Sequence, residues 1–406
     1  MRVMTGRDFE LWEANGPKIC VGEDAKGKPK WQPGWKWWLE HPYRESVDRI
    51  VFKPAQGEVK GVYNLYRGFD VEPYQGEDYA EKCSLYREHV DRYVCGNDPE
   101  VQKYLWAWLA DLMQRPGGRK PGVAVVMQGG QGAGKGSFVI PLTEIIGKRH
   151  AAHVAVKGRI LGRFNALSEG KILGYLDEAI WHGDKETQGA LKVLITEKTT
   201  VIEKKYQDPV TLDSFLRVIM ATNDIISVNA EEDARRYLCL EVVSPFDRVY
   251  EAERYKAYFD ALNEEMAPGG VGQQALLRYL LEYDGLAVDL ACAPRTAELD
   301  LQKLYNMTPI QEWVNERLET DGLTEAGVED APVHVLFTDF ISWCKDRQKK
   351  YFPNIIHFSR AFRKIFPQEG REIRVGRKDR KKRILLGTQE EQLAQFRKHM
   401  RLLEDF

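Results

Sequence analysis

The sequence predicts an α/β fold built on a mainly parallel β-sheet, and three observations support that prediction. Short apolar runs alternate with helical patterns over residues 122–245, as they do in parallel sheets. One apolar run, 123–127, leads into a glycine-rich loop that a helical pattern follows. Two later apolar runs end in polar side chains. We expect an N-terminal α+β region over 1–97, a central unit over 98–302 and a C-terminal unit over 303–406.

Composition and charge narrow the class of protein. No apolar run approaches the roughly 18 residues that a membrane span needs, and the first residues do not resemble a signal peptide. The six cysteines include no Cys-x-x-Cys pair, so neither a zinc site nor a disulfide framework is expected, and a reducing cytosol fits. The net charge is −2, yet residues 360–383 carry eleven Lys and Arg against three Asp and Glu. This end of the chain is predicted to meet an anion.

The N-terminal region is rich in aromatic residues and turns. Its clustered tryptophans are Trp31, Trp35, Trp37 and Trp38. Such a cluster can stack bases, but we favour a small core that needs large side chains. Two strand patterns follow, over 49–52 and 62–66. A helical pattern then begins after Asp98, a residue suited to capping a helix, and Pro99 suits its first turn.

The glycine-rich loop has the composition of a phosphate-binding loop. Glycines let the backbone curl so that N–H groups point at phosphate oxygens, and the following helix adds the partial positive charge of its N-terminus. Lys135 can then reach the β- and γ-phosphates. Gly136 stands where Ser or Thr usually offers a hydroxyl to Mg²⁺; Ser137 comes one residue late, so the direct metal ligand stays open. The candidate nucleotide-binding residues are Gly129, Gly130, Gln131, Gly132, Ala133, Gly134, Lys135, Gly136 and Ser137.

Two apolar strand patterns downstream of the loop end in residues suited to ATP chemistry. The run 172–176 is followed by Asp177 and Glu178. In a phosphate-loop ATPase the first acid holds Mg²⁺ through water, and the second polarises the water that attacks the γ-phosphate. The run 217–222 ends at Asn223, which we expect beside the acidic strand as a sensor of the γ-phosphate. Each motif alone is weak evidence for an ATPase. Their order and their spacing after the loop make the ATPase interpretation much stronger.

Two pairs of basic residues are candidates for contacts with a neighbouring subunit or with DNA. Arg235 and Arg236 precede another strand pattern and can offer a cation to the ATP of a neighbouring subunit, with surface salt bridges as the alternative. Residues 191–209 suggest a β-hairpin with Lys204 and Lys205 near its tip. In a ring these lysines would face the central channel and grip phosphates; two solvated lysines are the alternative.

Taken in this order, the motifs resemble those of the superfamily 3 helicases. They are most similar to the primase–helicases of phages and mobile elements, and more distantly to the poxvirus type. Residues 62–69, 162–165 and 195–196 also resemble the phage group, and the resemblance covers roughly residues 40–390. It implies an AAA+-like ATPase that uses ATP and Mg²⁺ and forms a ring, usually a hexamer, around single-stranded or forked DNA. It also implies a cytoplasmic location in a bacterial host and a primase or polymerase domain as a further partner.

The resemblance also implies roles for individual residues. By position, Lys135 matches the phosphate-loop lysine, and Asp177 and Glu178 match the acidic pair. Asn223 matches the sensor and Lys205 the hairpin lysine. Arg236 best matches the arginine finger, with Arg235 close behind. Gly136 is the clearest departure from the family pattern.

The C-terminal unit reads as helix, helix and basic hairpin, which is the outline of a winged helix. Amphipathic helices are expected over 335–349 and 357–366, and two strands with a charged turn over 371–386. Basic side chains here would contact backbone phosphates and give salt-dependent affinity, with a solvated charge run as the alternative. Besides the hairpin lysines, the candidate DNA contacts are Arg360, Arg363, Lys364, Arg377, Lys378, Lys381 and Lys382.

Two rival functions stay open beside the motor. A non-catalytic DNA-binding or initiator protein could use ATP only to set its assembly. A small-molecule phosphotransferase is suggested by the Gly-Lys-Gly-Ser sequence, but it does not explain the acidic strand end, the strand before Asn223 or the basic C-terminal unit. ATP hydrolysis that single-stranded DNA stimulates separates the motor from both. No primase active-site constellation is evident in the sequence.

Overall fold

The fold is taken from a computed structural model of the chain. It describes residues 6–54, 57, 59–154, 165–177, 185–203, 209–223, 235–285, 287–320, 322–324, 328–349, 353–367 and 383–403. The chain divides into two compact units, Met1–Leu65 and Tyr66–Phe406. Within the described ranges, no helix has the length and apolar character needed to cross a membrane.

The first unit is small and has little interior. Its elements are α1 (Gly6–Trp12), β1 (Lys18–Glu23), β2 (Pro29–Pro33), α2 (Gly34–Glu40), β3 (Arg49–Val51) and β4 (Val62–Asn64). Strands β1 and β2 form an antiparallel hairpin. The predicted tryptophan core is wrong, because Trp31, Trp37 and Trp38 are 61%, 38% and 45% exposed. One hairpin with two short helices supplies no second layer that could cover large side chains.

The second unit begins with helices that lead to a parallel sheet. These helices are α3 (Tyr79–Lys82), α4 (Ser84–Glu88), a π-helix over His89–Val94 and α5 (Pro99–Gln114). The predicted start of α5 is confirmed, because the Asp98 carboxylate accepts hydrogen bonds from the N–H groups of Glu100 and Val101. Eleven of its residues are buried, which makes α5 a central packing element of the unit.

The sheet has five strands, and every pairing between neighbours is parallel. In chain order the strands are β5 (Ala124–Gln128), β6 (Ala151–Val154), β7 (Leu173–Asp177), β10 (Arg217–Thr222) and β11 (Tyr237–Glu241). Their spatial order is β11-β5-β10-β7-β6. All residues of β10 are buried, as a strand covered on both faces requires. The predicted α/β fold with a parallel sheet is therefore confirmed.

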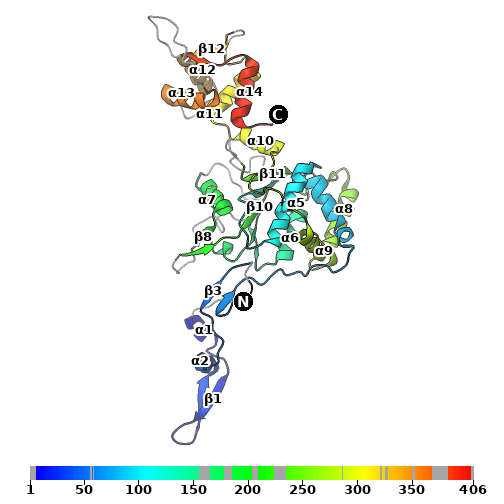
Figure 1. Ribbon diagram of the computed structural model, residues 1–406, viewed down its shortest axis with the longest axis vertical. Helices are drawn as coiled ribbons and strands as arrows, with labels where there is room; N and C mark the ends of the chain where they lie inside the picture. The colour runs from blue at the N-terminus through cyan, green and yellow to red at the C-terminus, as the bar shows by residue number, and fades with distance from the viewer. Residues whose placement is uncertain are drawn as a thin grey trace. The chain divides into compact units, whose positions relative to one another are not determined.

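Helices cover both faces of the sheet, as Figure 1 shows. One face carries α5, α6 (Lys135–Ile146), α8 (Ala252–Glu265) and α9 (Val271–Glu282), which contact one another. The other face packs against α7 (Lys185–Thr196) through Leu191, Leu194 and Ile195. Residues 191–196 are therefore helical, and the hairpin expected over 191–209 consists of β8 (Thr199–Ile202) and β9 (Val210–Asp213) alone.

The C-terminal part of the second unit is a helical cluster around an aromatic core. Its elements are α11 (Pro309–Glu319), β12 (Asp330–Pro332), α12 (Val333–Asp346), α13 (Ile355–Ile365), β13 (Arg383–Leu385) and α14 (Gln389–Met400). As predicted, the apolar face of α13 is buried: Phe358, Phe362, Ile365 and the following Phe366 pack on Trp313 and Phe340. Strand β13 pairs antiparallel with β12.

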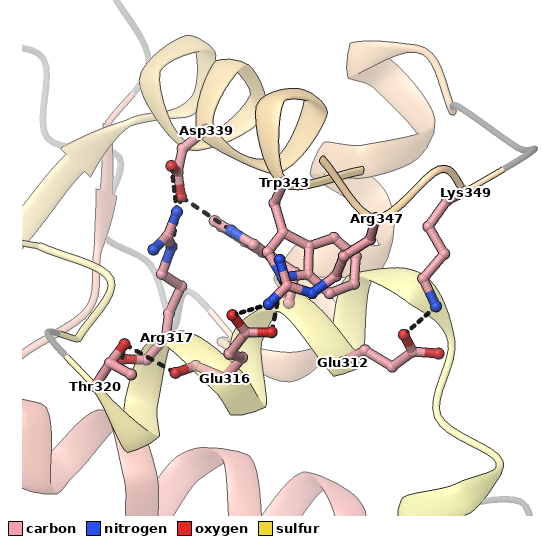
Figure 2. Close-up of polar contacts among 9 residues, drawn as sticks. Glu312, Glu316, Arg317, Thr320, Asp339, Trp343, Arg347 and Lys349 are labelled. Atoms are coloured by element: carbon pink, nitrogen blue, oxygen red, sulfur yellow. Dashed lines mark hydrogen bonds and ion pairs between the residues drawn. The ribbon is translucent and has the colours of Figure 1, made fainter. Parts of the chain in front are cut away.

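Polar contacts fix α12 against α11, as Figure 2 shows. Asp339 accepts two hydrogen bonds from the Arg317 guanidinium, at 2.9 and 2.7 Å, and one from the Trp313 indole at 2.9 Å. One turn away, Glu316 accepts from the Trp343 indole at 3.0 Å and pairs with Arg347. A bidentate guanidinium–carboxylate pair sets direction as well as distance. These contacts join α11 and α12, and both helices contact α13.

One further helix connects the sheet to the C-terminal part of the unit. This helix is α10 (Ala297–Tyr305). Its Gln302 donates a hydrogen bond from Nε2 to Oε1 of Gln128, the last residue of β5, at 3.0 Å. At its other side, buried Asp300 accepts from the backbone N–H of Leu403 at 2.6 Å. Lys303 donates to Asp300 and to the Arg401 carbonyl, each at 2.6 Å. Helix α10 thus contacts both the end of β5 and the residues that follow α14.

Candidate functional site

The glycine-rich loop joins β5 to α6, as the sequence predicted. Gly134 is the N-cap of α6 and has a φ of 103°, a region that favours glycine. A Cβ atom there would lie 2.5 Å from the His89 ring, so the position is closed to larger residues for two independent reasons. The loop therefore leads directly into the N-terminus of α6, where the first backbone N–H groups of a helix have no partner within the helix.

Lys135 lies over this loop and meets a residue far away in the sequence. Its ammonium donates to the carbonyls of Gly129 and Gly130, at 2.6 and 3.0 Å, and to Asn223 Oδ1 at 2.8 Å. Asn223 directly follows β10, which pairs with β5. Strand β10 also pairs with β7 (Leu173–Asp177), so Asn223 follows the strand beside the acidic one, as expected. Its contact with the loop lysine was not predicted from the sequence.

Asp177 lies at the same edge of the sheet. It ends β7, and it pairs in register with Ala221 of β10, two residues before Asn223. Its Oδ2 lies 3.2 Å from His153 Nε2, and the His153 ring stacks on Tyr175 at 4.6 Å. Sequence reasoning did not find His153, because a lone histidine on an edge strand has no distinguishing pattern. Glu178 lies outside the described residues.

These groups surround one open cavity of about 590 Å³. Loop residues Gln131 to Ser137 line it, while Gly129 and Gly130 form the base on which Lys135 lies. Ser137 and Asp177, the two candidate metal ligands, both face this space. Helix α6, helix α8 and the residue that follows α8 add to the lining: Ile140, Pro141, Glu144, Tyr255, Phe259, Leu262, Asn263 and Met266. Within the described ranges, no group of three or more His, Cys, Asp or Glu side chains gathers to hold a metal by itself.

Two side chains that contact carbonyl groups of the loop were not predicted from the sequence. His89 is fully buried and lies 3.2 Å from the Gly134 carbonyl through Nε2 and 3.1 Å from the Tyr258 hydroxyl through Nδ1. A carbonyl only accepts, so Nε2 carries the proton and Nδ1 accepts from Tyr258. The Tyr255 hydroxyl donates to the Gly132 carbonyl at 3.0 Å. Both contacts hold the loop through its carbonyl groups.

The burial of His89 makes the stability of the loop support depend on pH. Burial lowers the pKa of His89 to about 4, below the ordinary value of 6.5. Between pH 4 and pH 6.5 the unfolded chain therefore binds more protons at this histidine than the folded chain does. The contribution of neutral His89 to the free energy of unfolding is complete above pH 6.5 and falls as the pH drops toward 4. At pH 5 the loss is about 2 kcal/mol.

We expect the thermal midpoint of the wild type to fall more steeply from pH 7.5 to pH 5 than that of His89→Gln. The variant lacks the titrating group, although its amide can still hydrogen-bond. His334→Gln, at an exposed histidine of α12, controls for the loss of a histidine as such. Parallel slopes for the wild type and His89→Gln would show that His89 does not carry the pH dependence.

Arg235 and Arg236 lie at the opposite edge of the sheet. The Arg236 carbonyl accepts from the N–H of Ala124, the first residue of β5, and β11 starts at the next residue. Both arginines line a second cavity, of about 730 Å³, together with Arg119, Lys120 and Lys198. Lys120 is buried, and burial with repulsion from Arg217 lowers its pKa to about 8. The structure therefore separates this cationic cavity from the Lys135 site of the same chain.

The predicted DNA contacts are described in part. Arg360 and Lys364 are exposed on α13, and Arg363 is half-buried there. Arg360 and Arg363 line a shallow cavity of about 560 Å³ beside the start of α12. Lys204 and Lys205 of the hairpin, and Arg377, Lys378, Lys381 and Lys382 of the expected wing, lie outside the described residues.

Comparison with known proteins finds similarity to a phage protein and to a family of unknown function. A family model described as a family of unknown function, DUF5906, matches residues 127–236. A DNA primase-polymerase of Nitratiruptor phage NrS-1 is 29% identical over 137 residues, which are 33% of this chain and 19% of that protein. The match therefore spans about a fifth of the length of the curated relative.

Solved structures of the NrS-1 C-terminal region are similar in fold. One apo structure has a TM-score of 0.61 at 18% identity and covers 83% of this chain and 84% of that chain. Another apo structure has a TM-score of 0.51 at 20% identity and covers 68% and 66%. At these identities the likeness shows a shared fold, here a mixed α/β architecture on a five-stranded parallel sheet.

Proposed function

We propose that this chain is the ATP-hydrolysing motor of a DNA helicase of the superfamily 3, AAA+-like type, in phage or mobile-element replication. The observation that carries the proposal is the meeting of Lys135, Asn223 and Asp177 at one edge of a parallel sheet, around a cavity that the glycine-rich loop lines. Similarity to a phage primase-polymerase supports DNA replication as the setting. A primase or polymerase domain is the further partner that this setting suggests.

The residues around the cavity suit the hydrolysis of a nucleoside triphosphate. The backbone N–H groups of the loop and the Lys135 ammonium would hold the β- and γ-phosphates, and Asn223 would orient the γ-phosphate end. Asp177 and Ser137 offer oxygen atoms beside those phosphates, a set that fits Mg²⁺, which takes one or two protein oxygens plus phosphates and waters. Glu178 would accept the proton of the attacking water.

The motor would work as a ring of identical subunits, usually six. Arg235 and Arg236 lie at the edge of the sheet away from Lys135 of the same chain. Their guanidinium groups would contact the triphosphate that is bound to a neighbouring subunit. Lys204 and Lys205 would bind the phosphates of the DNA strand in the central channel of the ring. The C-terminal part, with α13 presented by α11 and α12, would act as a winged-helix-like DNA contact.

Stimulation of ATP hydrolysis by single-stranded DNA, measured together with unwinding of a forked duplex, tests this function. A motor is expected to hydrolyse ATP faster with DNA and to separate the strands. ATP binding and assembly without stimulated hydrolysis would favour the initiator. Phosphoryl transfer to a small acceptor, independent of DNA, would favour the phosphotransferase.

The basic face of α13 is expected to set the salt dependence of duplex binding. The double variant Arg360→Gln, Lys364→Gln should flatten the slope of log affinity against log salt by about one unit for each DNA phosphate that it no longer neutralises. Lys345→Gln, at an exposed lysine of α12, is the matched control and should keep the wild-type slope. Equal slopes for all three proteins would exclude α13 as a phosphate-contacting surface.

A further inference from the structure

We propose that the part of the 590 Å³ cavity between α6 and α8 is the nucleobase subsite, and that Glu144 and Asn263 select a base with an exocyclic amino group. Adenine, guanine and cytosine carry such a group, whereas uracil and thymine do not. The inference rests on the proposed nucleotide site and adds its base specificity.

The cavity has the length and direction that a nucleotide needs. Its phosphate end is marked by Lys135, the first residue of α6, and Glu144 faces the same cavity from nine residues further along that helix. At a rise of about 1.5 Å per residue, the two lie roughly 13 Å apart along the helix axis. This distance is comparable with that between the terminal phosphate and the base of an extended nucleoside triphosphate.

The walls of this part of the cavity are apolar and open. Gly136, Ile140 and Glu144 follow one another at intervals of four residues, so they share one face of α6. Ile140 is 45% exposed although it is apolar. A Cβ atom on Gly136 would meet only the end of Ile140, at 3.6 Å, so the glycine leaves this face clear. Leu262 of α8 and Met266, which follows that helix, line the same space. A planar base would cover this surface.

The polar edge of the subsite is held in place by a buried amide. Gln273 is fully buried and donates to Glu144 Oε2 at 2.6 Å and to the Met266 carbonyl at 3.0 Å. Its own oxygen accepts from the N–H of Gly269 at 2.9 Å. Both amide protons and the oxygen of Gln273 are therefore used. The Glu144 carboxylate is thereby fixed on the cavity wall.

Glu144 and Asn263 keep hydrogen-bonding capacity toward the cavity. Among the described residues, neither Glu144 Oε1 nor the Asn263 amide has a hydrogen-bond partner. An ionised carboxylate only accepts, so it needs a donor from the ligand. An amino group on the base supplies that donor, whereas a carbonyl of uracil at the same place would face the carboxylate without a proton between them. An unpaired polar group at a binding site costs affinity strongly, which makes this edge selective.

Competition binding tests the inference. ATP, GTP, CTP, UTP and inorganic tripolyphosphate would each displace a fluorescent ATP analogue from the full chain. We expect UTP to bind at least tenfold more weakly than ATP. Glu144→Gln, whose amide can also donate, should reduce this ratio at least fivefold, and Asn263→Ala should weaken ATP. Glu264→Gln removes an exposed carboxylate of α8 that does not line the cavity, and it should keep the wild-type ratio.

Tripolyphosphate separates failure of this inference from failure of the proposed function. Competition by tripolyphosphate that is abolished in Lys135→Ala would support the phosphate site independently of any base. With that result in hand, equal affinities for ATP and UTP, or a ratio that Glu144→Gln leaves unchanged, would overturn the base assignment alone. If neither tripolyphosphate nor any nucleotide competes, both proposals fail.

Discussion

Lys135→Ala is expected to lower ATP hydrolysis by at least about a hundredfold, with or without DNA. The ammonium lies over the loop within hydrogen-bond distance of two loop carbonyls and of Asn223. In the proposed site it would therefore neutralise the charge that builds on the transferred phosphate. Backbone N–H groups remain in the variant, but they carry only partial charge. Steady-state phosphate release at saturating ATP measures the effect.

The matched control for Lys135→Ala is Lys148→Ala, at an exposed lysine two residues beyond the end of α6. It removes the same charge and should retain wild-type turnover. Thermal midpoints of both variants exclude unfolding as the cause. If Lys135→Ala hydrolyses ATP at the wild-type rate, the glycine-rich loop is not a catalytic phosphate site.

Arg236→Ala is expected to lower hydrolysis by roughly 10³-fold or more while leaving ATP binding intact, as loss of an arginine finger does. Within one chain, Arg236 directly precedes the five residues of β11 and lies near the start of the neighbouring strand β5. Lys135 lies beyond the other end of β5. Five residues of strand extend about 17 Å. The guanidinium is therefore expected to serve the site of another subunit.

Mixing experiments test this arrangement directly. In mixtures of Lys135→Ala with Arg236→Ala, some interfaces combine an intact Lys135 from one subunit with an intact Arg236 from another. Those interfaces should restore part of the turnover that neither variant shows alone. Arg149→Ala, at an exposed arginine after α6, should behave as wild type. Full activity of Arg236→Ala, or of isolated monomers, would remove the intersubunit role.

The site could be predicted from the sequence where neighbouring residues or strand ends define it. The loop is contiguous, and Asn223 and Asp177 follow apolar strands whose carboxyl ends share one edge of a parallel sheet. His89 and Tyr255 could not be predicted, because they reach the site from helices whose packing no local pattern specifies. Glu144 lies on the predicted helix after the loop, but the sequence did not show that its face of the helix lines the cavity. His89 supports Gly134 from 45 residues away.

Two wrong predictions have clear physical causes. Residues 191–196 were expected in a hairpin, but Leu191, Leu194 and Ile195 have helical spacing and pack on the sheet as one face of α7. The tryptophans near Trp31 were expected in a core, but a run of large apolar side chains does not reveal whether a second layer exists to cover them. The first error concerns local conformation, because the helical spacing was present in the sequence, whereas the second concerns long-range packing.

Helix α10 has a thermodynamic consequence for the proposed motor. Through Gln302 it contacts the residue before the glycine-rich loop, and through Asp300 and Lys303 it contacts the chain after α14. If nucleotide binding at the loop displaces this helix, it also changes the free energy of DNA binding by the C-terminal part. The two binding events then share one coupling free energy. Linkage then requires reciprocity: the factor by which DNA changes the affinity for ATP equals the factor by which ATP changes the affinity for DNA.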